Sequence, residues 1–175
     1  LIQVLETKDP QVYADQVEKV VDPAEWAMYF AVNHLVGNNE RSLNTGVGGD
    51  FFLAERPSDG KYILVPWDEN ETFWPGLTNL RPFQLRWGRL RVVARFLEHP
   101  RFAPLYHRAL RELMDGPFSR GSFVRWKAYY GDTFRVQDVM ALEQFVEMRH
   151  GFLRALYPLA PRAGVQAEGE SSRSG

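Results

Sequence analysis

Acidic and amide side chains gather in one stretch of this 175-residue chain, between Asn38 and Asn70. Glu40 follows two asparagines, Asp50 stands alone, and Asp68 precedes Asn70 by two positions. Carboxylate and amide oxygens are hard ligands of the kind that Mg²⁺ and Mn²⁺ take, often together with phosphate oxygens. The pattern is typical of metal-assisted phosphate chemistry. Carboxylates of solvated surface loops would give the same pattern, and spacing alone leaves both interpretations open.

A predicted β-hairpin positions two of these carboxylates. Residues 50–55 and 61–65 are short β-prone runs, and a five-residue turn containing Asp-Gly joins them. The open ends of the two strands lie side by side, so Asp50 and Asp68 are expected within about 10 Å of each other. Trp67 and other large aromatic residues flank Asp68, and a carboxylate among them is costly to bury without a charged partner.

The rest of the chain has the pattern of helices. Asp9-Pro10 and Asp22-Pro23 each combine an N-cap with a proline at the first helical position. The helix after Pro23 is apolar on nearly every side, so we expect it to be buried and to end at Gly37. Helical spacing predicts later helices around residues 90–97, 102–113, 122–130 and 138–156. The expected fold class is mainly α with one small β-hairpin.

Two polar residues on predicted helices are expected to have structural roles. His34 lies on the buried helix, where a core position or a supporting position behind a site fits it best. Arg149 lies on the apolar face of the last helix. Because burial of an unpaired charge is costly, we expect Arg149 to be paired with a carboxylate, which could belong to the acidic site.

Composition excludes several classes of protein. Hydrophobic residues make up 45% and charged residues 25%, which excludes disorder of the whole chain. Apolar runs are too short for a membrane span, and a net charge of −1 gives no electrostatic case for nucleic acid. There is no cysteine, hence no thiolate chemistry. The chain begins without methionine and shows no signal-like segment, so we expect a piece of a longer protein, with localisation undetermined.

A family resemblance is carried by four segments: WAMYFAVNHL (26–35), GNNE (37–40), DFFL (50–53) and PWDENETF (66–73). Together they resemble the CotH family of spore-coat-type atypical protein kinases. Pro66-Trp67-Asp68 is the most specific element, and parts of the later helices support it. The resemblance covers roughly residues 1–157. It implies a kinase-like C-terminal lobe (α+β) over residues 1–158, followed by a small polar tail, 159–175, that we expect to be disordered.

The resemblance also implies an activity, which is transfer of the γ-phosphoryl group of ATP to protein serine or threonine hydroxyls with Mg²⁺ or Mn²⁺. The residues that it assigns are Glu40 and Asp68 as catalytic, Asn39 and Trp67 as nucleotide-binding, and Asp68, Asp50 and Asn70 as metal-binding. The family suggests a coat, surface or secreted protein, with a protein substrate as partner.

Departures from the family pattern keep a second function open. Glu40 and Asn70 stand where the family usually has aspartate, and Asp50 stands where it commonly has asparagine. No lysine lies in a strand context that fits the phosphate-binding lysine of a kinase. We therefore expect a nucleotide-binding lobe upstream of Leu1, without which this portion is inactive. The alternative is an inactive kinase-like scaffold that acts as a coat or surface interaction module.

Overall fold

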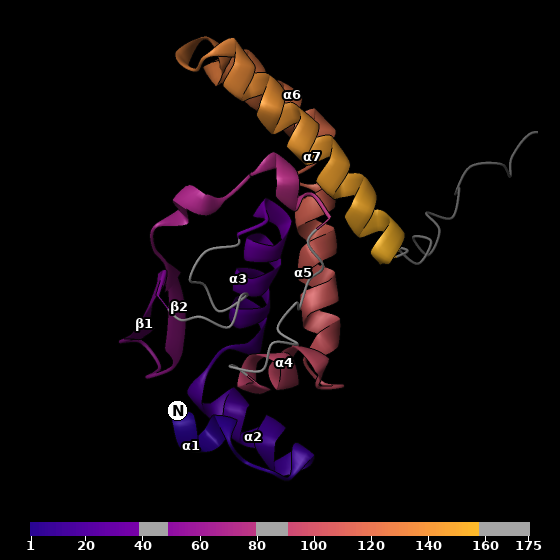
Figure 1. The fold of residues 1–175 in the computed structure, drawn as a ribbon. Coiled ribbons are helices and arrows are strands. Elements are labelled where there is room, and N and C mark those ends of the chain that lie inside the picture. Colours follow the sequence, from indigo (N-terminus) through magenta and orange to yellow (C-terminus); the bar gives the residue numbers. More distant parts are fainter. Residues whose placement is uncertain (39–48, 80–90, 158–175) are drawn as a thin grey trace, which may run out of the picture.

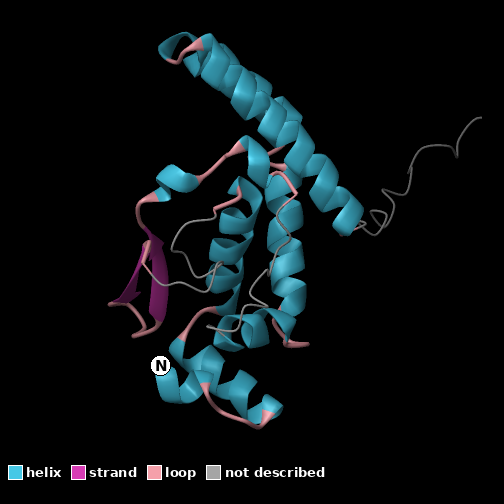
Figure 2. Ribbon diagram, in the orientation of Figure 1, coloured by secondary structure: helices cyan, strands magenta, loops and turns pink. Residues whose placement is uncertain are grey.

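The computed structural model describes residues 1–38, 49–79 and 91–157. Helices make up 67% of this part, which also contains one two-stranded antiparallel hairpin, as expected (Figure 2). The elements in chain order are α1 (Ile2–Leu5), α2 (Pro10–Val20), α3 (Pro23–Val36), β1 (Phe51–Glu55), β2 (Tyr62–Pro66), η1 (Glu69–Glu71), η2 (Pro75–Leu77), α4 (Arg91–Glu98), α5 (Ala103–Asp115), α6 (Arg120–Tyr130), η4 (Gly131–Thr133) and α7 (Val136–Leu156).

Aspartate caps begin the two helices where the sequence predicts them. The Asp9 carboxylate accepts from the backbone N–H of Val12 at 2.9 Å, and the Asp22 carboxylate accepts from that of Ala24 at 2.9 Å. Each cap satisfies a backbone donor that the helix leaves unpaired, and such caps are worth about 1 kcal/mol. Gly37 ends α3 in the left-handed conformation, with φ 66°.

The core forms where α3 packs beside α5 (Figure 1). Phe30 of α3 and Tyr106 of α5 are fully buried, and α4 adds Phe96, whose ring stacks on Phe102 with centroids 4.9 Å apart. Burial of large aromatic and aliphatic side chains supplies most of the stabilising free energy. As expected from its composition, α3 is mostly buried, although Val32 remains exposed.

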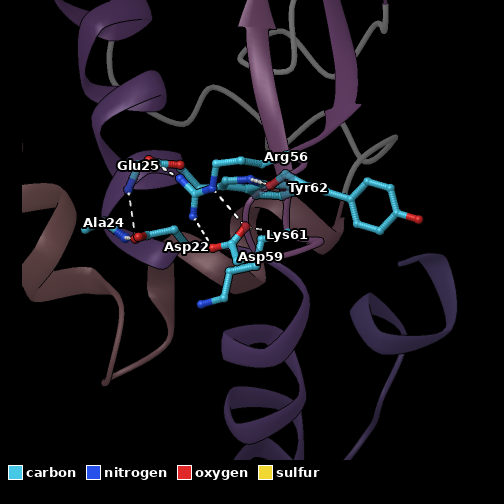
Figure 3. Close-up of polar contacts among 8 residues, drawn as sticks. Asp22, Ala24, Glu25, Arg56, Asp59, Lys61 and Tyr62 are labelled. Atoms are coloured by element: carbon cyan, nitrogen blue, oxygen red, sulfur yellow. Dashed lines mark hydrogen bonds and ion pairs between the residues drawn. The ribbon is translucent and has the colours of Figure 1, made fainter.

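The two strands of the hairpin pair with each other along their length, and the turn end of the hairpin is attached to α3. Phe51 pairs with Pro66 and Glu55 pairs with Tyr62, and the indole of Trp26 donates to the Tyr62 carbonyl at 2.9 Å. Arg56, in the turn, donates to the carboxylates of Glu25 and Asp59 (Figure 3). Hydrogen bonding to Arg56 lowers the pKa of Asp59 to about 2. The turn is therefore held against the first turn of α3, which fixes the direction in which the open end points.

Helices α6 and α7 form an antiparallel pair that extends away from the α3–α5 core (Figure 1). Phe145, Val146 and Arg149 bury one side of α7 near the end of α3. Over residues 1–38, 49–79 and 91–157, no helix is long and apolar enough to cross a membrane.

Candidate functional site

Asp50 lies at the open end of the hairpin, immediately before β1. Its backbone carbonyl accepts from the N–H of Trp67 at 3.2 Å, which extends the strand pairing by one step. Asp50 is only 9% exposed, and its Oδ2 atom is buried without a hydrogen-bond donor among the described residues. A buried carboxylate oxygen without a donor is costly, so this position favours a ligand or ion over a purely structural role.

The segment after β2 turns its three polar residues in different directions. Asp68 adopts a left-handed conformation, with φ 51°, and its side chain is exposed. Glu69 is half-buried and faces α3, whereas Asn70 is exposed again. Left-handed backbone is uncommon outside glycine, although aspartate tolerates it better than most residues, and it recurs at functional sites. Of the three residues, Glu69 is the one that faces α3 and accepts a hydrogen bond from Asn38.

Glu69 is the residue of this segment that contacts α3. Its Oε2 accepts from Nδ2 of Asn38 at 2.7 Å, and its Oε1 is buried without a donor from the described residues. Burial raises the pKa of Glu69, the hydrogen bond from Asn38 opposes this, and the charge of Asp50 raises it further. The negative charge of Asp50 therefore disfavours the ionised form of Glu69.

A chain of buried amides fixes the orientation of Glu69. Nδ2 of Asn38 also donates to Oδ1 of Asn33 at 2.9 Å, and Nδ2 of Asn33 donates to the Tyr29 carbonyl at 3.0 Å. Asn33 and Asn38 are each 2% exposed. We call this chain of hydrogen bonds the amide relay. Because Asn33 holds Asn38, the relay fixes the position of the Asn38 amide that donates to Glu69.

Tyr29 completes the polar group on α3. Its hydroxyl is buried with no hydrogen-bond partner among the described residues. Burial raises the pKa of Tyr29, the charge of Glu69 raises it further, the side chain of Asn33 lowers it, and the charge of Asp50 raises it. The hydroxyl stays protonated at neutral pH, so it can donate a hydrogen bond.

A cavity of about 400 Å³ opens between α3 and β2, next to this polar group. Its walls are mostly apolar, while its polar lining includes Asn33 and Glu69. The lining residues are Glu25, Met28, Tyr29, Val32, Asn33, Val36, Leu64, Pro66, Glu69, Thr72 and Phe73. Concave apolar sites with a few convergent polar groups are the usual form of small-ligand sites.

Arg149 holds the end of α3 in place behind the site. It is fully buried, its Nε donates to the His34 carbonyl at 3.1 Å, and its Nη1 donates to the Thr78 carbonyl at 3.3 Å. Burial lowers the pKa of Arg149 to about 10. The predicted burial is confirmed. The guanidinium also lies over the ring of Phe152, with Cζ 5.7 Å from the ring centroid, and the predicted pairing with a carboxylate stays a prediction. One side chain thus joins α3, the segment after η2, and α7.

Two further features tie the segment after β2 to α3. The backbone N–H of Phe73 donates to the Val36 carbonyl at 2.8 Å. Phe73 is also left-handed, with φ 60°, which is strained for a bulky residue. Its ring packs edge-on to Phe145 of α7, with centroids 5.5 Å apart. Strained residues at both ends of the segment indicate that tertiary contacts impose its path.

The donors at this site fit a magnesium-type ion. Oδ2 of Asp50 and Oε1 of Glu69 are hard oxygens without hydrogen-bond donors in the described structure. Mg²⁺ commonly binds through one or two protein carboxylates and completes its shell with water and phosphate oxygens. Within the described ranges no group of three or more His, Cys, Asp or Glu residues could hold a metal. Any such ion would therefore rest on two carboxylates and outside oxygens.

Comparison with known protein families shows which family the chain belongs to. Residues 1–149 match the family described as CotH kinase protein. The chain belongs to the CotH kinase family. The CotH match spans the hairpin, both acids and Arg149. No curated protein and no solved structure matches the chain.

Within this CotH chain, the structure describes only some of the predicted site residues. Asn39 and Glu40 lie outside the described residues. Trp67 is 60% exposed and packs edge-on to Phe52, with centroids 5.3 Å apart. The charge of Asp50 contributes to the raised pKa of Glu69, whereas Asp68 is exposed. The ligand role of Asp68 and that of Asn70 remain predictions.

Sequence reasoning missed Glu69, Asn33 and Tyr29. Glu69 was overlooked because Asp68 and Asn70 on either side occupy the positions to which the CotH family assigns chemistry. A signal was present for Asn33, because an amide on an otherwise apolar helix needs a buried partner, and Asn38 follows five positions later. Tyr29 carries no sequence signal that separates it from an ordinary core residue.

Proposed function

We propose that this chain carries the catalytic side of a CotH-family protein kinase. It transfers the γ-phosphoryl group of ATP to a serine or threonine hydroxyl of a protein, with Mg²⁺ or Mn²⁺. The observation that supports this proposal best is at the open end of the hairpin, where a carboxylate oxygen of Asp50 is buried without a hydrogen-bond donor among the described residues. The chain that contains it belongs to this family. Exposed Asp68, one step beyond the same end, is accessible to a metal–nucleotide complex.

The proposed division of roles follows from residue chemistry. Asp68 and Asp50 hold the metal, with Asn70 as an additional oxygen ligand, and Glu40 accepts the proton of the acceptor hydroxyl. Asn39 and Trp67 contact the nucleotide. A bound divalent ion would neutralise the negative charge on the phosphate oxygens. The side chains of the protein supply position, because phosphoryl transfer depends mainly on orientation and charge stabilisation.

A phosphate-binding lysine must come from outside the described site. Lys61 lies at the turn end of the hairpin, opposite to Asp50, and Lys127 donates to Glu143 on the α6–α7 pair. Lys8 and Lys19 belong to the region of α1 and α2. We therefore propose that full activity requires a further lobe that supplies this lysine and covers the nucleotide.

Transfer of radiolabel from [γ-³²P]ATP to a mixture of candidate substrate proteins tests this function. The protein is expressed with whatever natural sequence precedes Leu1, and Mg²⁺ and Mn²⁺ are supplied in separate reactions. Labelling that disappears in Asp68→Ala supports the kinase. Absence of labelling with both ions, together with failure of Glu40→Asp to restore it, contradicts the kinase.

A second candidate function is a kinase-like scaffold without chemistry, acting as a coat or surface interaction module. It is favoured by the absence, in the described ranges, of a three-ligand cluster for a metal. It is also favoured by Asn70, which replaces a family carboxylate with a neutral amide. Under this function the protein would bind partners without ATP-dependent labelling.

A further inference from the structure

We propose that two copies of this chain associate through α7, with the two helices antiparallel. The contact is made by one exposed face of the helix, which we call the outer stripe. Its residues are Val136, Met140, Gln144, Met148, Gly151 and Ala155. Association of this kind is independent of the proposed kinase activity, so the two can be tested separately.

The outer stripe lies on the side of α7 that is turned away from the core. At about 100° per residue, its six residues fall within an arc of about 120°, opposite the side that buries Phe145 and Leu153. Val136 is 73% exposed, Met140 62% and Met148 50%. A second helix can reach them, because α6 and α7 extend away from the α3–α5 core (Figure 1). Single exposed apolar residues are ordinary, whereas a row of them along one helix face marks a contact surface.

The two halves of the outer stripe differ in size, and an antiparallel pair matches them. The first half carries the large residues Val136 and Met140, and the second half ends in the small residues Gly151 and Ala155. One antiparallel register places Met140 opposite the partner's Gly151 and Val136 opposite the partner's Ala155. Large side chains then pack over small ones, which lets the helix axes approach to about 8–10 Å. A second copy therefore fits this surface, through a two-fold contact that closes on itself.

Gly151 has no role in the folding of α7 that the described structure explains. It lies in the interior of the helix, and a Cβ added there would meet nothing within 4 Å. Glycine inside a helix is less favourable than alanine, because it loses more backbone freedom on folding. Close approach of a second helix gives this glycine a purpose, since the side chain of the partner's Met140 needs the space that a larger residue would fill.

The polar groups beside the outer stripe also favour a second copy over a strongly charged partner. Glu147 is paired with Arg120 at 3.7 Å, and Arg154 is paired with Asp115 at 3.1 Å, so these charges are compensated within the chain. An oppositely charged partner therefore gains little here. The register that matches the large and small residues places Gln144 opposite the partner's Glu147, where an amide can donate to a carboxylate. Two such contacts flank the two-fold axis.

Sedimentation velocity of the full chain, over protein concentrations from about 10 to about 300 µM, tests the association. One helix face is smaller than the roughly 800 Å² that each partner buries in a stable complex, so we expect a reversible dimer with a micromolar Kd. Met140→Lys should weaken it at least about tenfold. Val124→Lys, at an exposed apolar position on α6, is the matched control and should associate as the unmodified chain does. A monomer at every concentration, or equal effects of the two variants, would overturn the proposal.

Disulfide cross-linking tests the antiparallel register, because the chain contains no cysteine of its own. Val136→Cys and Ala155→Cys are prepared separately and oxidised alone and as a mixture. Positions 136 and 155 of opposite copies face each other in the register above, whereas the two copies of position 136 lie roughly 28 Å apart along the helices. We expect linked dimers of one variant with the other in the mixture and few from either variant alone. Linkage of each variant to itself, or no linkage in the mixture, would contradict the antiparallel pair.

Discussion

Nδ2 of Asn38 lies 2.7 Å from Oε2 of Glu69 and 2.9 Å from Oδ1 of Asn33, so one buried amide joins the end of α3 to the segment after β2. The hairpin separates these two segments in the sequence. Their connection means that the position of the acids depends on the last turn of α3. Changes in that turn should therefore affect both stability and the site.

Replacement of Asn38 tests the amide relay. Asn38→Ala should lower the free energy of unfolding by about 1–3 kcal/mol, because it leaves buried acceptors of Asn33 and Glu69 without their donor. Urea unfolding in EDTA measures this difference. Asn70→Ala, at an exposed position nearby, should change it by less than about 0.5 kcal/mol. Equal effects of the two variants would show that the relay contributes nothing to stability.

Substitution of glycine by alanine is expected to have opposite effects on stability at Gly37 and at Gly151. Gly37 has φ 66°, and an added Cβ would lie 3.0 Å from Cζ of Phe145, so Gly37→Ala should destabilise the protein by at least about 1 kcal/mol. Gly151 lies within α7, where an added Cβ meets nothing within 4 Å. Gly151→Ala should therefore stabilise the protein by about 0.5–1 kcal/mol. Thermal melting compares the two, and a stabilising Gly37→Ala would contradict the left-handed cap.

Loss of Arg149 should be among the most damaging single changes. Arg149→Met removes the donors to the carbonyls of His34 and Thr78, and the expected loss of stability is at least about 2 kcal/mol. Arg154→Met is the control on the same helix. Its ion pair with Asp115 is partly exposed, so it should contribute only about 0–1 kcal/mol. Similar midpoints of urea unfolding for both variants would refute the structural role of Arg149.

His34 should make stability depend on pH. Burial, together with the charge of Arg149, lowers its pKa from 6.5 to about 3. Between these values the unfolded chain binds a proton that the folded protein does not, so stability falls as pH falls through this window. The contribution of one such group approaches a slope of about 1.4 kcal/mol per pH unit. His34→Gln should reduce the slope measured by urea unfolding at pH 4–6, and an unchanged slope would contradict a neutral His34.

Local chemistry explains which parts of the fold were predictable. Asp9-Pro10, Asp22-Pro23 and Gly37 mark helix ends through backbone rules that act within a few residues, and the structure confirms each of them. The hairpin was predictable for the same reason, since its turn and its β-prone runs are contiguous. The short helix α1 was not predicted, because a single turn of four residues carries almost no periodic signal.

The direction in which each side chain of the site points could not be predicted from the sequence, because it depends on tertiary contacts. Asp68, Glu69 and Asn70 are consecutive polar residues, and the contact with Asn38 of a distant segment is what distinguishes Glu69, which faces α3. The burial of Arg149 followed from the apolar face on which it lies. Its carbonyl partners could not be inferred, since they come from two segments distant in sequence.

Calorimetric titration of ATP in the presence of Mn²⁺ tests most directly whether the open end of the hairpin binds a metal–nucleotide complex. The protein carries its natural upstream sequence, and each titration is repeated in EDTA. We expect binding that requires Mn²⁺ and that Asp50→Asn and Asp68→Asn each weaken at least about tenfold, with Glu71→Gln unchanged. Binding that is equally strong in EDTA, or that both aspartate variants leave intact, would contradict the account.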